Sequence, residues 1–393
     1  MKKLLSIILL AALTLVSCGQ AEKRSRFFDE YYFFVGIDCG NSTLMKLNVD
    51  TGSITPLCSD PLCRHNESCQ FYGVNSTSML SETSDRLYFS RRNTSDYTYE
   101  VLGYDPENQS VELVFKSEPT GNLNGQFLGK ASFSIRNGYI WNSYQSPDGT
   151  EKLTRIDLKT KKPVELPVSA KIPMSGGYNG KFIYPIGEKG EYLSHGFALG
   201  DIDGNISKTY ATDKVIQLID TEQIEDDILL FMCPYELENG KYDYERQTLW
   251  SCNLKTGEQK LLHDDYGDVY FLRLGNFIYY LNYIDDPTEV GYDKNQNRTV
   301  YNRTGGKLMR LDITTGEEIL FMQFAHVFTA INLAQKSGKL IFDYMDTDYD
   351  DYETVDAGRG KDWYDYKVTR GWVIIDPSDN SFIDVVNTAD IFE

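Results

Sequence analysis

The sequence predicts an all-β protein, a single β-propeller of seven four-stranded blades. Three observations support this prediction: an aromatic-rich composition, a strand-and-turn pattern that recurs about every 55 residues, and no sustained helical periodicity after residue 26. Of the 393 residues, 13% are aromatic, with 28 Tyr and 20 Phe, and Gly (31) outnumbers Pro (12). Aromatic side chains are enriched in strands, and Gly provides the positive φ of tight turns.

The repeating unit is a strand that ends in Asp or Asn and is followed by a turn rich in Thr, Asn and Gly. An Asp or Asn side chain at this place can accept a hydrogen bond from its own backbone two residues on. A short apolar strand precedes each anchor strand, so we name these two strands B and C and expect A and D to flank them. The seven anchors are Asn48, Asp105, Asp157, Asp201, Asn253, Asp312 and Asp376. Seven repeats without a linker favour one closed ring over the alternative, two β-sandwich domains.

The first blade has no obvious inner strand A. Either Phe27 and Phe28, or residues 389–392 at the other end of the chain, would supply it and close the ring. The sequence does not decide between the two.

The N-terminus has the pattern of an export signal. Lys2 and Lys3 precede the apolar run 4–16, which is too short to span a bilayer. The run ends in Leu15-Val16-Ser17-Cys18, which resembles the lipobox of bacterial lipoproteins. We therefore expect a signal peptide at 1–17, a lipidated Cys18 with a tether at 18–26, and a propeller at 27–393. The alternative is an ordinary signal peptide with an incidental Cys18.

The charge of the chain restricts its partners. It has 58 Asp and Glu against 39 Lys and Arg, a formal net charge of −19. Such a protein repels phosphate backbones and anionic lipid headgroups, so nucleic acid is excluded as a partner. Attachment to a membrane would depend on the acyl chains of a lipid anchor.

Three long B-to-C loops, at residues 234–247, 284–306 and 345–370, belong to consecutive blades. In an antiparallel blade these loops and the D-to-A connectors emerge on one face, where propellers commonly bind ligands. Aromatic side chains beside carboxylates suit a sugar ring or a peptide, and the alternative is that the loops are merely solvated. The candidate ligand-binding residues are Tyr235, Tyr292, Tyr349, Tyr352, Trp363 and Tyr364.

A calcium site near Asp346, Asp348 and Asp350 is a further hypothesis, because alternate carboxylates are hard oxygen donors. The EF-hand pattern fails, since its sixth position is occupied by Asp351 and its twelfth by Ala357. The alternative is a charged, exposed loop.

The most distinctive segment contains Cys58, Cys63, His65 and Cys69 in the connector from blade 1 to blade 2. Three thiolates and an imidazole form a legitimate zinc-binding set, although the spacing lacks paired C-x2-C knuckles. The alternative is disulfide staples, for instance between Cys39 and one of the three, as the even number of cysteines after Cys18 would suit an exported protein.

A second cysteine pair lies in blade 5. Cys233 falls late in strand B and Cys252 falls in the adjacent strand C. We expect a cross-strand disulfide between them, with free buried thiols as the alternative.

The lipobox, the blade pattern and the segment from Cys58 to Cys69, with Pro61 before its second Cys, together resemble a known group. It consists of predicted lipoproteins from gut Firmicutes, β-propellers of unknown function that carry a Cys-x4-Cys-x-His-x3-Cys segment. The resemblance implies a lipid-anchored propeller on the outer face of a bacterial cell membrane, in a Gram-positive organism. It carries no catalytic residues over to this chain.

The sequence contains no G-x-S-x-G, H-E-x-x-H or Walker A motif. Its four histidines, His65, His195, His263 and His326, are expected to be structural or exposed. The first hypothesis is therefore a non-catalytic binding or scaffold protein for a glycan, a peptide or a partner protein. Two alternatives remain: a carboxylate-based, glycan-active hydrolase on the same face, and a metal or redox sensor centred on Cys58 to Cys69.

Overall fold

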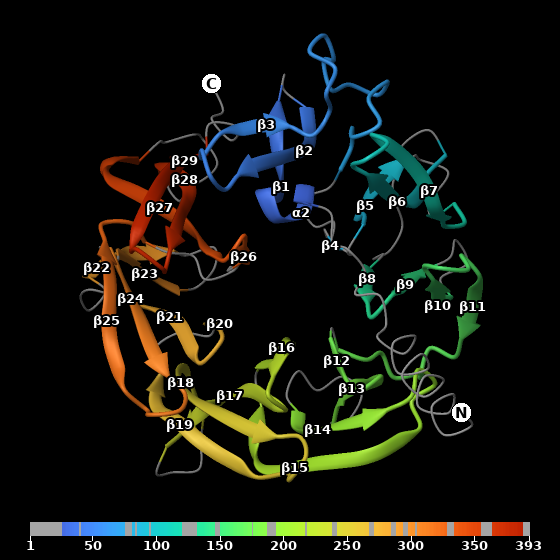
Figure 1. Cartoon of the computed structure of the whole chain (residues 1–393). Coiled ribbons are helices and arrows are strands. Elements are labelled where there is room, and N and C mark those ends of the chain that lie inside the picture. Colours follow the sequence, from blue (N-terminus) through green and yellow to red (C-terminus); the bar gives the residue numbers. More distant parts are fainter. Residues whose placement is uncertain are drawn as a thin grey trace, which may run out of the picture.

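The computed structural model shows a ring of seven antiparallel β-sheets (Figure 1), which confirms the predicted propeller. It describes residues 26–387 except 39–40, 75–80, 83–84, 94–95, 120–131, 146–149, 175, 187–193, 217, 238–241, 267–270, 284–287, 294–297, 303–304, 328–333 and 355–363. For some strand residues it describes the backbone alone. Cys18, Cys39 and Trp363 lie outside the described residues. No described helix is long and apolar enough to cross a membrane.

The blades follow one another in chain order, and neighbouring strands within each blade pair antiparallel. Blade 1 has three described strands, β1 (Tyr31–Asp38), β2 (Asn41–Asn48) and β3 (Ile54–Pro56). Blade 2 is formed by β4 (Ser81–Glu82), β5 (Leu87–Asn93), β6 (Thr98–Asp105) and β7 (Ser110–Lys116). Blade 3 is formed by β8 (Ser132–Arg136), β9 (Tyr139–Gln145), β10 (Glu151–Asp157) and β11 (Pro163–Leu166). Blade 4 is formed by β12 (Gly177–Tyr178), β13 (Lys181–Pro185), β14 (Ser194–Gly200) and β15 (Ile206–Ile216).

The other three blades complete the ring. Blade 5 is formed by β16 (Leu218–Glu225), β17 (Ile228–Glu236), β18 (Tyr242–Asn253) and β19 (Gln259–Tyr266). Blade 6 is formed by β20 (Phe271–Leu274), β21 (Phe277–Tyr283), β24 (Gly306–Asp312) and β25 (Glu318–Phe324). Blade 7 is formed by β26 (Ala334–Lys336), β27 (Lys339–Thr354), β28 (Tyr364–Asp376) and β29 (Ser381–Val386).

The anchors of the repeat stand where their strands C end, and every one of them organises the following turn. In blade 1 the side chain of Asn48 accepts the backbone N–H of Asp50 at 3.0 Å, and in blade 6 Asp312 accepts that of Thr314 at 2.8 Å. The other five anchors accept the N–H of the residue two positions on in the same way. This local bond explains why the repeat was visible in the sequence.

The buried apolar residues lie between neighbouring blades. Six buried clusters are found among the described residues, and each combines residues of two adjacent sheets. A propeller blade therefore packs on both faces, so its middle strands are buried without alternation. Strand β6, for example, is buried at seven consecutive positions.

The ring closes where blade 7 meets blade 1. Phe34 packs on Trp372 with ring centroids 4.5 Å apart, and Nζ of Lys339 lies 2.6 Å from a carboxylate oxygen of Asp50. The predicted inner strand at Phe27 and Phe28 is wrong, because both residues lie in a short helix, α2 (Arg26–Glu30). The other predicted closing segment, residues 389–392, lies outside the described residues.

The three long B-to-C segments are largely strands, which corrects the prediction that they are loops. In blades 5 and 7 the β17–β18 and β27–β28 hairpins run on past the ends of their blades, and in blade 6 the insertion forms its own hairpin of β22 (Thr288–Asp293) and β23 (Arg298–Asn302). Strand continuation needs a pairing partner, which the sequence alone did not reveal. All three hairpins connect B to C, so the antiparallel order places them on the same face of the ring as the D-to-A connectors.

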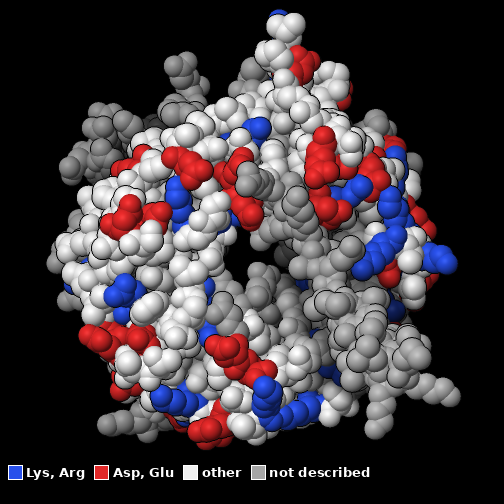
Figure 2. Space-filling view, in the orientation of Figure 1, with Lys and Arg blue, Asp and Glu red and all other residues white. Residues whose placement is uncertain are grey.

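The space-filling view shows a ring that is hollowed at its centre (Figure 2). Acidic side chains are spread over several blades around the ring in this view, with basic side chains among them. The described charge therefore forms no single-sign patch on this face.

Candidate metal centre

The candidate site is built on the connector 57–74, which follows β3 at the outer edge of blade 1. The backbone N–H of Leu57 still donates to the carbonyl of Leu44 on β2, at 2.8 Å, so the connector begins as a continuation of the sheet. It then makes a tight turn in which Cys63 N–H donates to the carbonyl of Asp60 at 3.1 Å. The Asp60 carboxylate accepts the N–H of Leu62 at 2.9 Å, which stabilises this turn from inside.

A second turn brings the last cysteine back toward the first two. Asn66 accepts the N–H of Ser68 through its side chain at 3.2 Å and that of Cys69 through its carbonyl at 2.8 Å. Between the two turns His65 adopts a left-handed φ of 47°, which reverses the chain sharply. Local turn chemistry thus folds the segment onto itself.

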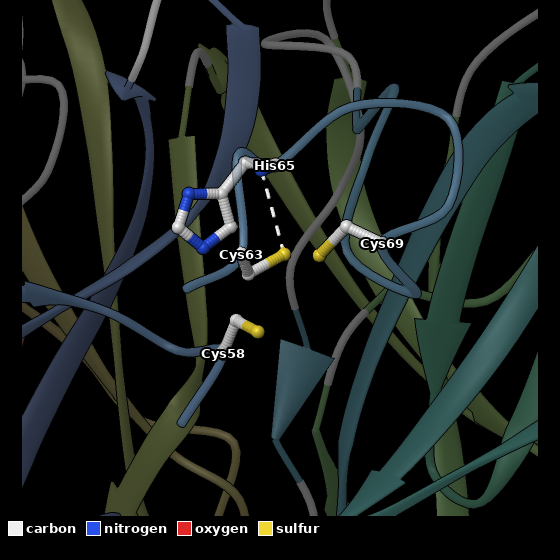
Figure 3. Close-up of side chains that lie close together, drawn as sticks. All are labelled: Cys58, Cys63, His65 and Cys69. Carbon is white, nitrogen blue, oxygen red and sulfur yellow. Dashed lines mark hydrogen bonds between the residues drawn. The ribbon is translucent and has the colours of Figure 1, made fainter. Parts of the chain in front are cut away.

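The result is a compact cluster of four potential ligands. One ligand atom of each of Cys58, Cys63, His65 and Cys69 lies within 4.8 Å of all the others. Figure 3 shows the sulfurs facing one another with the imidazole beside them. Zn–S bonds of about 2.3 Å place tetrahedral ligand atoms roughly 3.8 Å apart. The described side chains need only a small contraction to reach that geometry.

The sulfurs receive hydrogen bonds from the backbone in one repeated arrangement. The N–H of His65 donates to Sγ of Cys63 at 3.4 Å, and that of Phe71 donates to Sγ of Cys69 at 3.5 Å. A backbone hydrogen bond from Asp60 reaches Cys58. Each of the three sulfurs therefore accepts a hydrogen bond from the backbone N–H two positions on in the chain. Such hydrogen bonds stabilise the negative charge of a metal-bound thiolate.

Burial works against ionisation of the same thiols. His65 and Cys69 are buried, with 3% and 5% of their surface exposed, whereas Cys58 and Cys63 are half-buried. Burial raises the pKa of Cys69 to about 12 and also raises the pKa of Cys58. A bound cation would therefore displace protons from these thiols and supply the charge that makes thiolates stable there.

The cluster can hold a metal ion, which is one of the two alternatives that the sequence left open. Three sulfurs and one imidazole nitrogen suit a soft or borderline cation and match a Cys3His structural zinc set. The alternative of disulfide staples is not formed among these residues, because Cys58, Cys63 and Cys69 are free thiols. A staple through Cys39 concerns a residue outside the described chain.

The predicted disulfide between Cys233 and Cys252 is wrong, because both cysteines are free and buried. In the register of β17 with β18, Cys233 lies opposite Thr248 and Cys252 lies opposite Leu229. Four residues of strand separate the two cysteines, which is about 13 Å. A disulfide cannot span that distance.

The predicted ligand-binding tyrosines lie on the extended hairpins. Tyr235 is half-buried on β17, and the structure places the backbone of the others on these strands: Tyr292 on β22, Tyr349 and Tyr352 on β27, and Tyr364 on β28. For all of them except Tyr235 the structure describes the backbone alone, so their role in binding stays a prediction.

The carboxylates proposed for calcium lie on β27, and the first of them is already engaged. Oδ2 of Asp346 lies 2.6 Å from Nδ1 of His326, and its Oδ1 accepts the N–H of Val327 at 2.8 Å. The side chains of Asp348 and Asp350 lie outside the description. No group of three or more carboxylates in metal-binding reach is found among the described residues.

Sequence reasoning missed the cluster around His326. The imidazole bridges Asp346 and Asp384, with Nε2 at 2.8 Å from Asp384, and stacks on Tyr344 with centroids 3.9 Å apart. These residues belong to the connector after β25, to β27 and to β29, at the root of the longest hairpin. No local motif signals the cluster, because its other members are 18 to 58 positions from His326 in the sequence.

The fold and the cluster together define a seven-bladed β-propeller with a Cys3His candidate metal centre in the connector between its first two blades. No protein-family model matches the sequence, and the comparison with curated proteins found no relative.

Solved structures match the fold over most of the chain. An oligogalacturonate lyase in complex with manganese aligns with a TM-score of 0.50 and 12% identity, over 81% of this chain and 84% of the lyase. An uncharacterized protein from Listeria monocytogenes aligns with a TM-score of 0.50 and 12% identity, over 93% of this chain and 94% of that one. The β-propeller domain of the trilobed protease from Pyrococcus furiosus, described as having an open velcro topology, gives a TM-score of 0.50 and 12% identity over 92% and 95% of the two chains. At this identity the likeness shows the shared fold.

Proposed function

We propose that this chain is an exported, lipid-anchored β-propeller that binds a glycan, a peptide or a partner protein without catalysis. One observation carries the proposal: the B-to-C hairpins of three consecutive blades, β17–β18, β22–β23 and β27–β28, are elongated and belong to the same face of the ring. A ring whose elongated hairpins occur side by side presents a wide, one-sided surface to a ligand.

The anchor in this proposal is Cys18, which becomes the diacylated N-terminus after removal of residues 1–17. The support is the order of a basic start, an apolar run and the Leu15-to-Cys18 segment. The body would then lie on the outer face of a bacterial membrane. The direct test is metabolic labelling of the expressed chain with a fatty acid, followed by membrane fractionation. Wild type should be labelled and sediment with membranes, whereas Cys18→Ser should lose the label. An unlabelled wild type would contradict the anchor.

Zinc is the cation that we propose for Cys58, Cys63, His65 and Cys69. The support is the ligand set, the convergence within 4.8 Å and the three backbone bonds to sulfur. Calcium is not part of the proposal, because both carboxylate oxygens of Asp346 already accept hydrogen bonds from His326 and Val327. An ion held by four protein ligands has no open position for substrate, so this zinc would be structural.

Binding is tested by screening the full chain against arrays of bacterial and host glycans and of peptides, with chromatographic analysis of every hit for products. The tyrosine variant Tyr349→Ala/Tyr352→Ala on β27 should weaken a hit at least about tenfold, the loss of roughly one stacking contact. Phe382→Ala is the matched control, since it removes an exposed aromatic ring from the outer strand of the same blade. Equal affinity of both variants would exclude the β27–β28 hairpin from the binding site.

The screen also decides between binding and hydrolysis. A hit that is turned over would replace the binding proposal by the glycan-active hydrolase. The fold itself is compatible with an enzyme, because the oligogalacturonate lyase above has a similar one. Metal sensing is the second candidate function, and the free thiols in metal-binding reach favour it. It predicts that ligand affinity changes when zinc is removed, which the same screen measures after chelation.

A further inference from the structure

The joint between blades 1 and 2 has little regular strand pairing. Its outer strand β3 contains three residues and its inner strand β4 contains two, whereas the neighbouring outer strand β7 contains seven. Blade 1 also has no described inner strand, and α2 packs in its place. This blade therefore depends more than the others on contacts made outside its own sheet.

The cysteine connector supplies such contacts on the side of blade 1. Side chains of β2 hold it at three points along its length. Asn41 donates to the carbonyl of Arg64 at 3.2 Å. Thr43 donates to the carbonyl of Phe71 at 3.3 Å, and Ser42 donates to that of Val74 at 2.6 Å.

The same connector is attached to blade 2. The guanidinium of Arg91 on β5 donates to the carbonyl of Gln70 at 3.3 Å, and Val74 forms an isolated antiparallel bridge with Arg91. At the outer end, the hydroxyl of Ser59 donates to Gln109 at 3.2 Å. The connector is thus clamped between the sheets of two blades.

The candidate ligands are packed into the core of this joint. Cys69 belongs to a buried cluster with Leu44 of blade 1 and Phe89 of blade 2, and Cys58 and Cys63 pack against it. Hydrogen bonds and apolar packing hold the connector in its shape, and a cation would in addition cross-link four of its positions at once. Cross-linking removes conformations that the connector would otherwise sample.

From this arrangement we propose that the metal ion is a latch that fixes blade 1 to blade 2 and thereby holds blade 1 in place for closure of the ring against blade 7. The inference rests on the proposed zinc site and adds its role. Blade 1 meets blade 7 through Phe34 and Trp372. Loss of the ion should therefore destabilise both edges of blade 1 and have little effect on the stability of the distant blades.

The test uses the full-length chain purified in detergent, treated with a chelator and then titrated with zinc chloride. Three quantities are measured: zinc per chain by mass spectrometry, the thermal midpoint, and amide hydrogen exchange by strand. One zinc should raise the midpoint by roughly 3 °C or more. It should slow exchange in β2 and β5 about tenfold and leave β17 unchanged.

Variants separate the latch from a simple metal store. Cys63→Ser should lose both zinc and the protection of β2 and β5, whereas Cys252→Ser, which changes a buried free thiol outside the cluster, should keep both. Binding of one zinc without change in midpoint or exchange would overturn the latch and leave the zinc site intact. Absence of bound zinc in wild type would overturn both. The wild-type titration decides the matter even if Cys63→Ser does not fold.

Discussion

The imidazole Nδ1 of His326 lies 2.6 Å from Oδ2 of Asp346, and the opposite ring nitrogen lies 2.8 Å from Asp384. Two carboxylates on two strands of blade 7 thus hold one histidine from the connector that enters the blade. This contact ties the connector to the root of the β27–β28 hairpin, where Met345 also donates its N–H to the carbonyl of Val327 at 2.9 Å.

The first prediction is that this contact makes stability depend on pH. Burial opposes the charged form of His326, but hydrogen bonds and charge from Asp346 and Asp384 outweigh it and raise its pKa. The folded state then binds the proton more tightly than the unfolded state. Its contribution is complete below the unfolded pKa of about 6.5 and is lost as pH rises through the raised pKa. His326→Gln should lower the thermal midpoint at pH 6 more than at pH 9.

The matched control for that experiment is His195→Gln, which changes an exposed histidine on blade 4. It should leave the difference between pH 6 and pH 9 as it is in wild type. A wild-type midpoint that does not respond to pH in this range, or responds equally in both variants, would contradict the role of His326.

The second prediction concerns the anchors of the repeat. Hydrogen bonds donated within the turns lower the pKa of the five aspartate anchors, Asp105, Asp157, Asp201, Asp312 and Asp376. Their contribution to stability is present above the unfolded pKa of about 3.9 and is lost as pH falls through the lowered values. Replacing the five with Asn, as the chain itself does at Asn48 and Asn253, should reduce the loss of stability between pH 5 and pH 3. Urea unfolding at several pH values measures this. If the variant loses as much stability between pH 5 and pH 3 as wild type does, the prediction is contradicted.

The third prediction concerns helix α2. Phe28 is fully buried among residues of blades 1 and 2, in the place where other blades have an inner strand. Phe28→Ala should therefore reduce the free energy of unfolding by about 3–5 kcal/mol, and Phe28→Leu by less. Phe382→Ala, at a ring that is 52% exposed, should cost under about 1 kcal/mol. If Phe28→Ala and Phe382→Ala reduce the free energy of unfolding equally in a denaturant titration, α2 does not close the core.

The fourth prediction is that Cys233 and Cys252 are free but unreactive thiols. Burial raises the pKa of Cys233 to about 12 and that of Cys252 to about 11. Alkylation at pH 8 without reductant should leave both unmodified in the folded protein and modify both after unfolding in urea. Peptide mass spectrometry distinguishes them from the other cysteines. If either cysteine of the unfolded protein is alkylated only after a reductant is added, the two are joined in a disulfide and the prediction is contradicted.

The propeller could be predicted because its signals are local. Asp157, for instance, bonds the N–H of Lys159 two residues on, and every blade repeats such a bond at the same point of its sequence. The candidate metal ligands could be located for the same reason, since Cys58 to Cys69 span twelve positions and two Asx turns fold that segment back on itself.

Predictions that depended on pairing register or on distant contacts were wrong or absent. The B-to-C segments of blades 5 and 7 extend the β17–β18 and β27–β28 hairpins. Each extension is a strand only because the opposite strand continues beside it and pairs with it, which the sequence does not show. The disulfide of blade 5 failed because the register places Cys233 opposite Thr248, and the sequence contains no signal for register.

By itself, the sequence determined the all-β repeat, its seven blades and the segment that holds the candidate ligands, because these follow from turn chemistry over a few residues. The tertiary structure alone decided that Cys58, Cys63, His65 and Cys69 converge within 4.8 Å as free thiols and an imidazole, between two blades. It also decided that His326 meets Asp346 and Asp384. Turns at Asp60 and Asn66 fold the cysteine connector locally. Its place between two blades and the contacts of His326 arise from the packing of neighbouring sheets in a closed ring, which no spacing along the chain encodes.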